Sequence, residues 1–167
     1  MKLETLQDLF VDQLKDLYSA ENQIVKALPK MADATSTPEL QRGFEEHLEQ
    51  TRNQIDRLKQ IFQGLNMSSI HAKTCKGMEG IIHEGNEYMV GNADPKVRDA
   101  GLIAAAQRVE HYEISGYGSA RAIANRLGYT TAAELLQQTL DEEKATDQKL
   151  TAIAEQKVNT QAQMSAN

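Results

Sequence analysis

Acidic side chains occupy positions where the spacing of a helix calls for apolar ones. Between residues 95 and 127 the apolar residues recur three or four positions apart, and Glu113 falls near the centre of that series, with Glu110 one turn earlier at its edge. Similar series near both ends of the chain also contain acids. A buried carboxylate is costly unless it is protonated or paired. The acids that we expect to face inward are Glu21, Glu110, Glu113, Glu143 and Asp147.

A single imidazole accompanies these acids. The segment 38–63 places His47 on its inward face, and no lysine or arginine lies at the centre of any of the four apolar series. Glu21 and Glu113 each stand about fifteen residues before a predicted turn, so they lie at the same level of the molecule. Carboxylates and an imidazole on facing helices match a site for two iron or manganese ions. The predicted metal ligands are Glu21, His47, Glu110, Glu113, Glu143 and Asp147.

Each of these residues also has a purely structural interpretation. Glu21 alone could be a buried acid that is hydrogen-bonded to a tyrosine, and a lone His47 is more often a core histidine than a ligand. The spacing of Glu110 and Glu113 is uninformative by itself, because surface helices often show it. Asp147 could hold a ligand in place without touching the metal.

Other polar residues are expected to have structural or solvated roles. Tyr117 lies one turn after Glu113 on the same face, where core packing is the favoured role and a hydrogen bond to a ligand or a part in redox chemistry are the alternatives. His71, His83 and Cys75 lie in the predicted connection between the hairpins, and we expect all three to be solvated.

Two long helical hairpins should position the inward groups. Pro38 and Pro95 suit the first position of a helix, Gly128 suits the end of one, and Thr131 with Glu134 predicts a capping box. The connection between the hairpins is long and carries a shorter helix of its own. This pattern predicts an all-α, ferritin-like four-helix bundle with one crossover, the same helices in another order being the alternative. The expected helices are 3–31, 38–63, 75–90, 95–127 and 131–156.

Length and composition favour one soluble domain. The chain has 167 residues, which we divide into a helical domain at 1–156 and a polar tail at 157–167. The net charge of −6, without a run of basic residues, argues against nucleic acid as a partner. No apolar stretch approaches the roughly 20 residues of a membrane span, and the N-terminus lacks a signal-peptide pattern. The single cysteine fits a reducing compartment, so we expect a cytoplasmic protein.

Four stretches together closely resemble the bacterial YciF-like stress proteins, a ferritin-like family. They are "LKDLYSAENQIVKALPKMA", "FEEHLEQT", "VRDAGLIAAAQRVEHYEISGYG" and "LDEEKATDQKL", within a resemblance that covers about residues 3–155. The resemblance implies a bundle related to rubrerythrin and bacterioferritin, a homodimer, a cytoplasmic location and a role in stress responses.

The chain departs from the usual di-iron pattern of that superfamily. Two helices normally carry a glutamate followed three residues later by histidine, whereas here Arg52 follows Glu49 and Thr146 follows Glu143. The pattern is therefore carried over at Glu21, at Glu110 or Glu113, and at Glu143, with His47 and Asp147 as substitutes.

Two functions are consistent with these residues. The first is a stress-response protein whose iron or manganese site reacts with oxygen or peroxide. The alternative is a metal-free structural or interaction dimer, in which the inward acids share protons and water.

Overall fold

The fold consists of helices throughout the part of the chain that the computed structural model describes, namely residues 3–67, 70 and 73–164, and these residues form no strand. This confirms the all-α prediction. The helices are α1 (Leu6–Ala34), α2 (Pro38–Gly64), α3 (Lys76–Val90), α4 (Pro95–Leu127), α5 (Thr130–Ile153), a π-helical turn (Ala154–Val158) and α6 (Asn159–Met164). No helix in these ranges is both long and apolar enough to cross a membrane.

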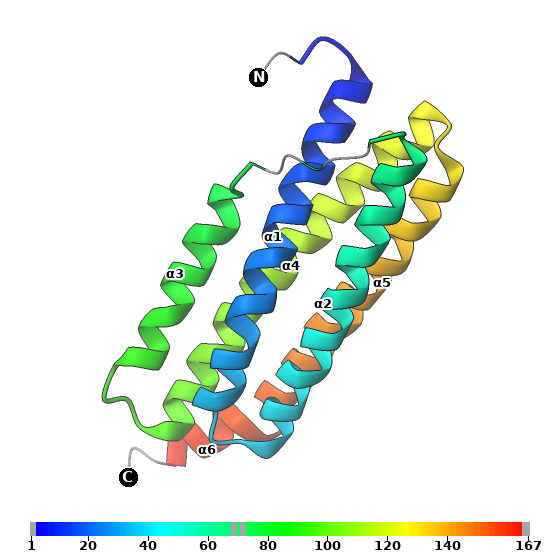
Figure 1. The fold of residues 1–167 in the computed structure, drawn as a ribbon. Coiled ribbons are helices and arrows are strands. Elements are labelled where there is room, and N and C mark those ends of the chain that lie inside the picture. Colours follow the sequence, from blue (N-terminus) through cyan, green and yellow to red (C-terminus); the bar gives the residue numbers. More distant parts are fainter. Residues whose placement is uncertain (1–2, 68–69, 71–72, 165–167) are drawn as a thin grey trace.

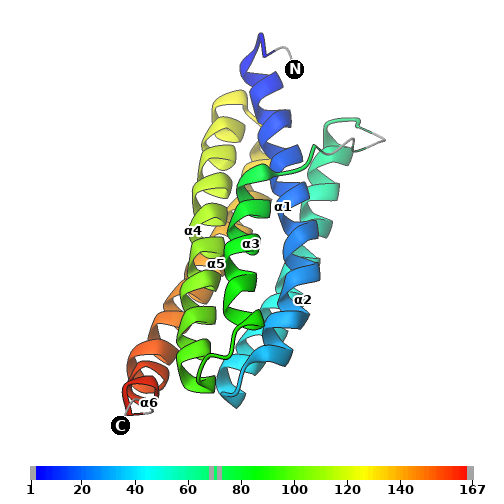
Figure 2. The same cartoon turned by 90° about the vertical axis from the view of Figure 1, so that its left-hand side faces the viewer.

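Two antiparallel hairpins form a four-helix bundle. One hairpin is α1 with α2 and the other is α4 with α5, and they pack so that α1 lies against α4 and α2 against α5 (Figure 1). Helix α3 packs on α4 and α1 from outside and returns the chain along the length of the bundle (Figure 2). As a result α4 begins at the same end as α2. The predicted crossover with its own helix is thus confirmed.

The turn between α4 and α5 differs in detail from the sequence prediction. Gly128 ends α4 with a positive φ of 75°, as predicted, and the backbone N–H of Tyr129 donates to the carbonyl of Ala124 over 2.9 Å. This closure lets α5 begin directly after Tyr129, which is its N-cap residue and makes no side-chain capping bond. Thr131 and Glu134 therefore lie inside the helix, and the predicted capping box is wrong.

The chain remains helical beyond Gln156, where the sequence predicts a polar tail. The π-helical turn Ala154–Val158 joins α5 to α6, and Val158 is completely buried. Apolar residues are too sparse after Gln156 to give a periodic signal, so the spacing pattern did not predict that Val158 would be buried.

The start of α3 is packed more tightly than the sequence suggests. Cys75 is the N-cap residue of α3 and is fully buried, with its Sγ 2.9 Å from the hydroxyl of Tyr112 and 3.1 Å from Oδ2 of Asp16. The prediction of a solvated Cys75 is therefore wrong. His83 is exposed as predicted, and His71 lies outside the described residues.

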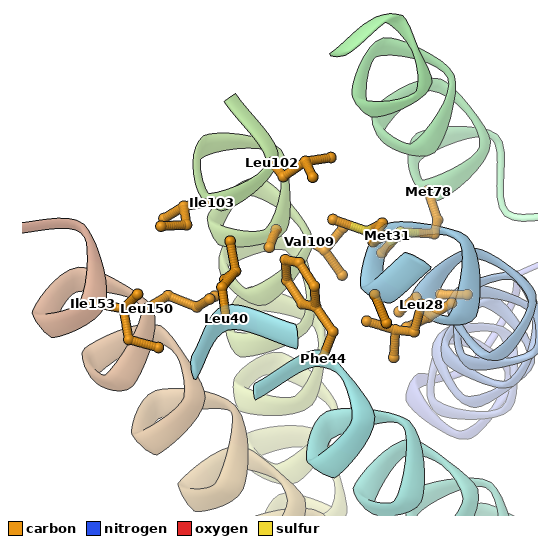
Figure 3. Close-up of a cluster of buried hydrophobic side chains, with 14 of the residues drawn as sticks. Leu28, Met31, Leu40, Phe44, Met78, Leu102, Ile103, Val109, Leu150 and Ile153 are labelled. Atoms are coloured by element: carbon orange, nitrogen blue, oxygen red, sulfur yellow. The ribbon is translucent and has the colours of Figure 1, made fainter. Parts of the chain in front are cut away.

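Two apolar clusters fill the bundle, one towards each end. The first cluster lies where α3 packs on the bundle, and Figure 3 shows Phe44 of α2 reaching between α1 and α4 towards Leu28 and Val109. The first cluster includes Ile24, Leu28, Met31, Leu40, Phe44, Met78, Leu102, Ile103, Val109, Leu150 and Ile153. The second cluster includes Phe10, Leu14, Leu17, Leu58, Ile61, Phe62, Tyr117, Ala120, Ala124, Leu136 and Leu140. In α2, α4 and α5, buried polar residues stand between the parts that belong to the two clusters.

Candidate metal centre

A polar layer separates the two apolar clusters. Its central members come from α2, α4 and α5, and each offers one ligand atom, all of these atoms lying within 4.8 Å of one another. The four residues are at most 3% exposed. They are His47, Glu110, Glu113 and Glu143. The inward placement that helical spacing predicted for these four is confirmed, and such a group can hold a metal ion.

Glu21 of α1 joins this layer from the remaining side. It is completely buried, and one of its carboxylate oxygens accepts a hydrogen bond from the hydroxyl of Tyr117. Its carboxyl group also interacts with that of Glu113. Tyr117 thus packs in the second cluster, as predicted, and also holds Glu21.

The layer contains more hydrogen-bond acceptors than donors. His47 Nε2 lies 3.4 Å from Oε1 of Glu110, but this contact lacks the geometry of a hydrogen bond. Within the described residues, the buried atoms that have no hydrogen-bond partner include Oε2 of Glu21, Glu110 and Glu143, both carboxylate oxygens of Glu113 and both ring nitrogens of His47. Buried polar atoms are nearly always satisfied, and a cation would satisfy this particular set.

Burial dominates the protonation of the layer. It raises the pKa of Glu21 to about 8, with repulsion from Glu143 adding to the shift, and it raises the pKa of Glu143 to about 7. The pKa values of Glu110 and Glu113 also lie well above the ordinary value, through burial first and neighbouring carboxylates second. Burial lowers the pKa of His47 to about 4, so its imidazole is neutral and has a lone pair for a metal.

Gln54 supports the layer and was missed by the sequence prediction. It is completely buried, and its Nε2 donates to Glu143 and, over 3.0 Å, to Oε2 of Glu142. Arg57 holds the same Glu142 with two bonds of 2.6 Å. Gln54 stands three positions after the inward Thr51, so the helical spacing contained the signal that identifies it.

The structure places Asp147 at the edge of the bundle, which corrects its predicted inward position. Its side chain is 22% exposed, lies 3.4 Å from Nε2 of His111 and accepts a hydrogen bond of 3.1 Å from Nε2 of Gln107. Rotation by about 100° per residue puts Asp147 only about 40° from the direction of Glu143, so its edge position reflects the bond from Gln107 of α4 and not its place in the helical series. It is not part of the central group.

The comparisons with known proteins agree over nearly the whole chain. Residues 5–163 match the family described as a domain of unknown function (DUF892). Protein YciF of Escherichia coli strain K12 is 48% identical over 166 residues, which cover 99% of this chain and 100% of that protein.

Solved structures extend this similarity to the fold. The crystal structure of the E. coli stress protein YciF has a TM-score of 0.90 and covers 94% of this chain and 99% of its own. YcfI from Rhodopseudomonas palustris is 41% identical with a TM-score of 0.88, covering 92% of this chain and 97% of its own. A Xanthomonas campestris protein, 21% identical with a TM-score of 0.76 over 98% of this chain and 100% of its own, shares the fold.

Proposed function

This chain belongs to the family described as a domain of unknown function (DUF892), which confirms its resemblance to the YciF-like stress proteins, and we propose that it is a ferritin-like metal protein of the stress response. One observation carries the proposal: bundle helices direct buried carboxylate oxygens and imidazole nitrogens into one layer, where these atoms lack hydrogen-bond partners among the described residues. The acidic surface and the single cysteine support a cytoplasmic location.

The ligand set has an oxygen majority and one nitrogen. Glu110, Glu113 and Glu143 supply carboxylate oxygens, His47 supplies the nitrogen, and Glu21 completes the set from α1. Such ligands suit iron or manganese, and the number of carboxylates is consistent with about two ions per chain. When bound, the metal would supply a change of oxidation state in a reaction with oxygen or peroxide.

The surrounding residues prepare this site. Gln54 orients Glu143 through a hydrogen bond, and Tyr117 orients Glu21 in the same way. The two apolar clusters lie on either side of the layer and exclude water from it. His47 is held in the neutral form that a metal requires.

The test is the metal content of protein purified without chelator, measured by mass spectrometry. We expect about two iron or manganese ions per chain. Optical spectra of the iron-loaded, reduced protein should then change when oxygen is admitted. The variant His47→Ala should lose metal, and the matched control His111→Ala, on a 69% exposed histidine, should keep it. A protein that stays free of metal after reconstitution would contradict the proposal.

A metal-free structural or interaction dimer is the second candidate. The observation that favours it is the set of buried acids with raised pKa values, since neighbouring carboxyl groups can share protons; these acids are Glu21, Glu110, Glu113 and Glu143. A homodimer is expected in both cases, and light scattering coupled to size exclusion measures it. If the dimer forms and reconstitution leaves it without metal, this candidate replaces the first.

A further inference from the structure

An apolar cavity adjoins the His47 and Glu110 side of the polar layer. It has a volume of about 30 Å³ and lies between helices α1, α2, α3, α4 and α5. Much of its wall is the first cluster, including Leu28, Phe44 and Val109, which converge in Figure 3. The cavity therefore extends from His47 and Glu110 of the polar layer to the residues of α3 that line it.

The polar side chains around this cavity are largely occupied elsewhere. Thr146 donates its hydroxyl to the carbonyl of Glu142 over 3.1 Å, and the ammonium of Lys149 is bonded to Glu46. Asn86 on α3 is the further polar residue of the wall. A polar ligand would therefore form few hydrogen bonds with this wall.

Small residues keep the space open. Gly43 of α2 lines the cavity, and a Cβ at this position would lie 3.9 Å from Cδ1 of Ile153, which is an ordinary van der Waals contact. Gly85 of α3 is more confined, since its Cβ would lie 3.2 Å from that of Ala105. Glycine is unfavourable inside a helix, so Gly43 lowers helix stability relative to alanine while leaving room beside the layer.

The volume of the cavity and its apolar lining together limit which ligand can occupy it. A buried water needs about 10–15 Å³ and two to four polar partners, so this cavity of about 30 Å³ has room for about two waters but offers poor bonding for them. Hydrogen peroxide carries two hydroxyl groups, which would lose their hydrogen bonds to water on entering an apolar space. Dioxygen has a suitable size and needs no such bonds.

We propose that this cavity binds dioxygen and admits it to the His47 and Glu110 side of the polar layer, in preference to hydrogen peroxide. Binding of the gas depends only on the cavity. Its consequence for chemistry rests on the proposed metal site.

The first test uses metal-free, methyl-labelled protein under oxygen pressure. Dissolved dioxygen is paramagnetic, so methyl groups beside a bound molecule should relax faster in NMR spectra. We expect the excess relaxation at Ile24 and Leu150, which line the cavity and are 2% and 3% exposed. The comparison is with Leu14 and Leu58 of the second cluster, which are 0% and 1% exposed. Equal relaxation in the two groups would overturn the proposal, whatever the metal content of the protein.

The second test fills the cavity with one methyl group. Gly43→Ala should remove most of the excess relaxation, and Gly80→Ala, an exposed helical glycine with nothing within 4 Å of its added Cβ, is the matched control. After metal loading, Gly43→Ala should slow oxidation by dioxygen several-fold and leave oxidation by hydrogen peroxide unchanged. An equal loss with both oxidants, or unchanged relaxation in Gly43→Ala, would contradict the proposal.

The two proposals fail in distinguishable ways. If the excess relaxation is seen and depends on Gly43 but no metal binds, the proposal that the cavity binds dioxygen is supported and the proposed function fails. If metal binds and no excess relaxation is seen, the proposed function stands and the cavity is not a dioxygen site.

Discussion

Asp99 and Glu113 are both completely buried acids on α4, yet their surroundings are opposite. Asp99 accepts hydrogen bonds from the hydroxyls of Thr35, Ser36 and Thr37 and from the backbone N–H of Ser36, at 2.6 to 3.0 Å. Neither carboxylate oxygen of Glu113 has a hydrogen-bond partner in the described part of the chain. Burial alone therefore does not mark a ligand; the absence of donors does.

The pKa values of the two acids follow this difference. Burial raises the pKa of Asp99, but the bonds from Thr37, Ser36 and Thr35 outweigh it, so its pKa lies below the ordinary value of 3.8. For Glu113, burial and the neighbouring Glu21 and Glu143 act together, and its pKa lies well above 4.5. Asp99 is thus a charged structural acid that fixes the turn between α1 and α2, whereas burial and the neighbouring carboxylates disfavour the charged form of Glu113, which a bound cation would favour.

Removal of Asp99 should have the largest effect on stability. Asp99→Ala leaves its donors without an acceptor, and we expect a loss of about 3 kcal/mol in the free energy of unfolding with no loss of bound metal. Chemical denaturation and mass spectrometry measure the two quantities. Asp33→Ala, on an exposed acid of α1, is the control and should change neither. A large loss of metal in the folded Asp99→Ala protein would erase the distinction between the two acids.

The metal-free protein should be most stable at mildly acidic pH. The raised pKa values of Glu21 and Glu143 contribute stability that is fully present below 4.5 and is lost as pH rises through about 7 and about 8. The lowered pKa of Asp99 contributes stability that is present above 3.8 and is lost as pH falls below it. Denaturation at a series of pH values should show a maximum near pH 4 to 5 and a fall of several kcal/mol towards pH 8. A steady gain from pH 5 to 8 without metal would contradict this account.

Tyr117→Phe should have a moderate effect on the layer. The change removes the hydroxyl that donates to Glu21 while keeping the buried ring, so stability should fall by about 1 kcal/mol. Because this bond lowers the pKa of Glu21, its loss should raise that pKa further and weaken metal binding at neutral pH. Metal titration of both proteins measures the change. An unaltered affinity would show that Tyr117 only packs in the core.

Asp147→Asn should have the smallest effect. Asp147 is partly exposed, and asparagine keeps an oxygen that can accept the bond from Gln107. We expect full metal content and a change in stability within about 0.5 kcal/mol. Loss of metal in this variant would return Asp147 to the ligand set.

Much of the fold and of the candidate site could be predicted from local rules. Pro38 and Pro95 fix the first turns of α2 and α4, and Gly128 ends α4, because their backbone preferences act locally. The rotation of about 100° per residue correctly placed His47 and Glu113 inside. The same rule failed at Asp147, whose carboxylate bonds to Gln107 at the edge of the bundle although its place in the helical series predicts an inward position.

The remaining features depend on contacts between segments that are distant in the sequence. The donors to Asp99 come from the turn between α1 and α2, more than sixty positions away. The sequence around Asp99 contains no pattern that predicts these hydrogen bonds. Cys75 lies in a connection without periodicity, and its burial results from packing against Tyr112 and Asp16. Such contacts exist only after the hairpins have assembled.

The most direct measurement is the change in melting temperature that Mn²⁺ or Fe²⁺ causes in three proteins at neutral pH. At about a hundredfold excess over Kd, the wild type should melt roughly 5–10 °C higher with metal. Glu113→Gln should show no such shift, and Glu49→Gln, on a 67% exposed acid, should behave like the wild type. The central claim that the unpartnered acids are metal ligands would be contradicted if neither ion stabilised the wild type. It would also be contradicted if the ions raised the melting temperature of Glu113→Gln as much as that of the wild type.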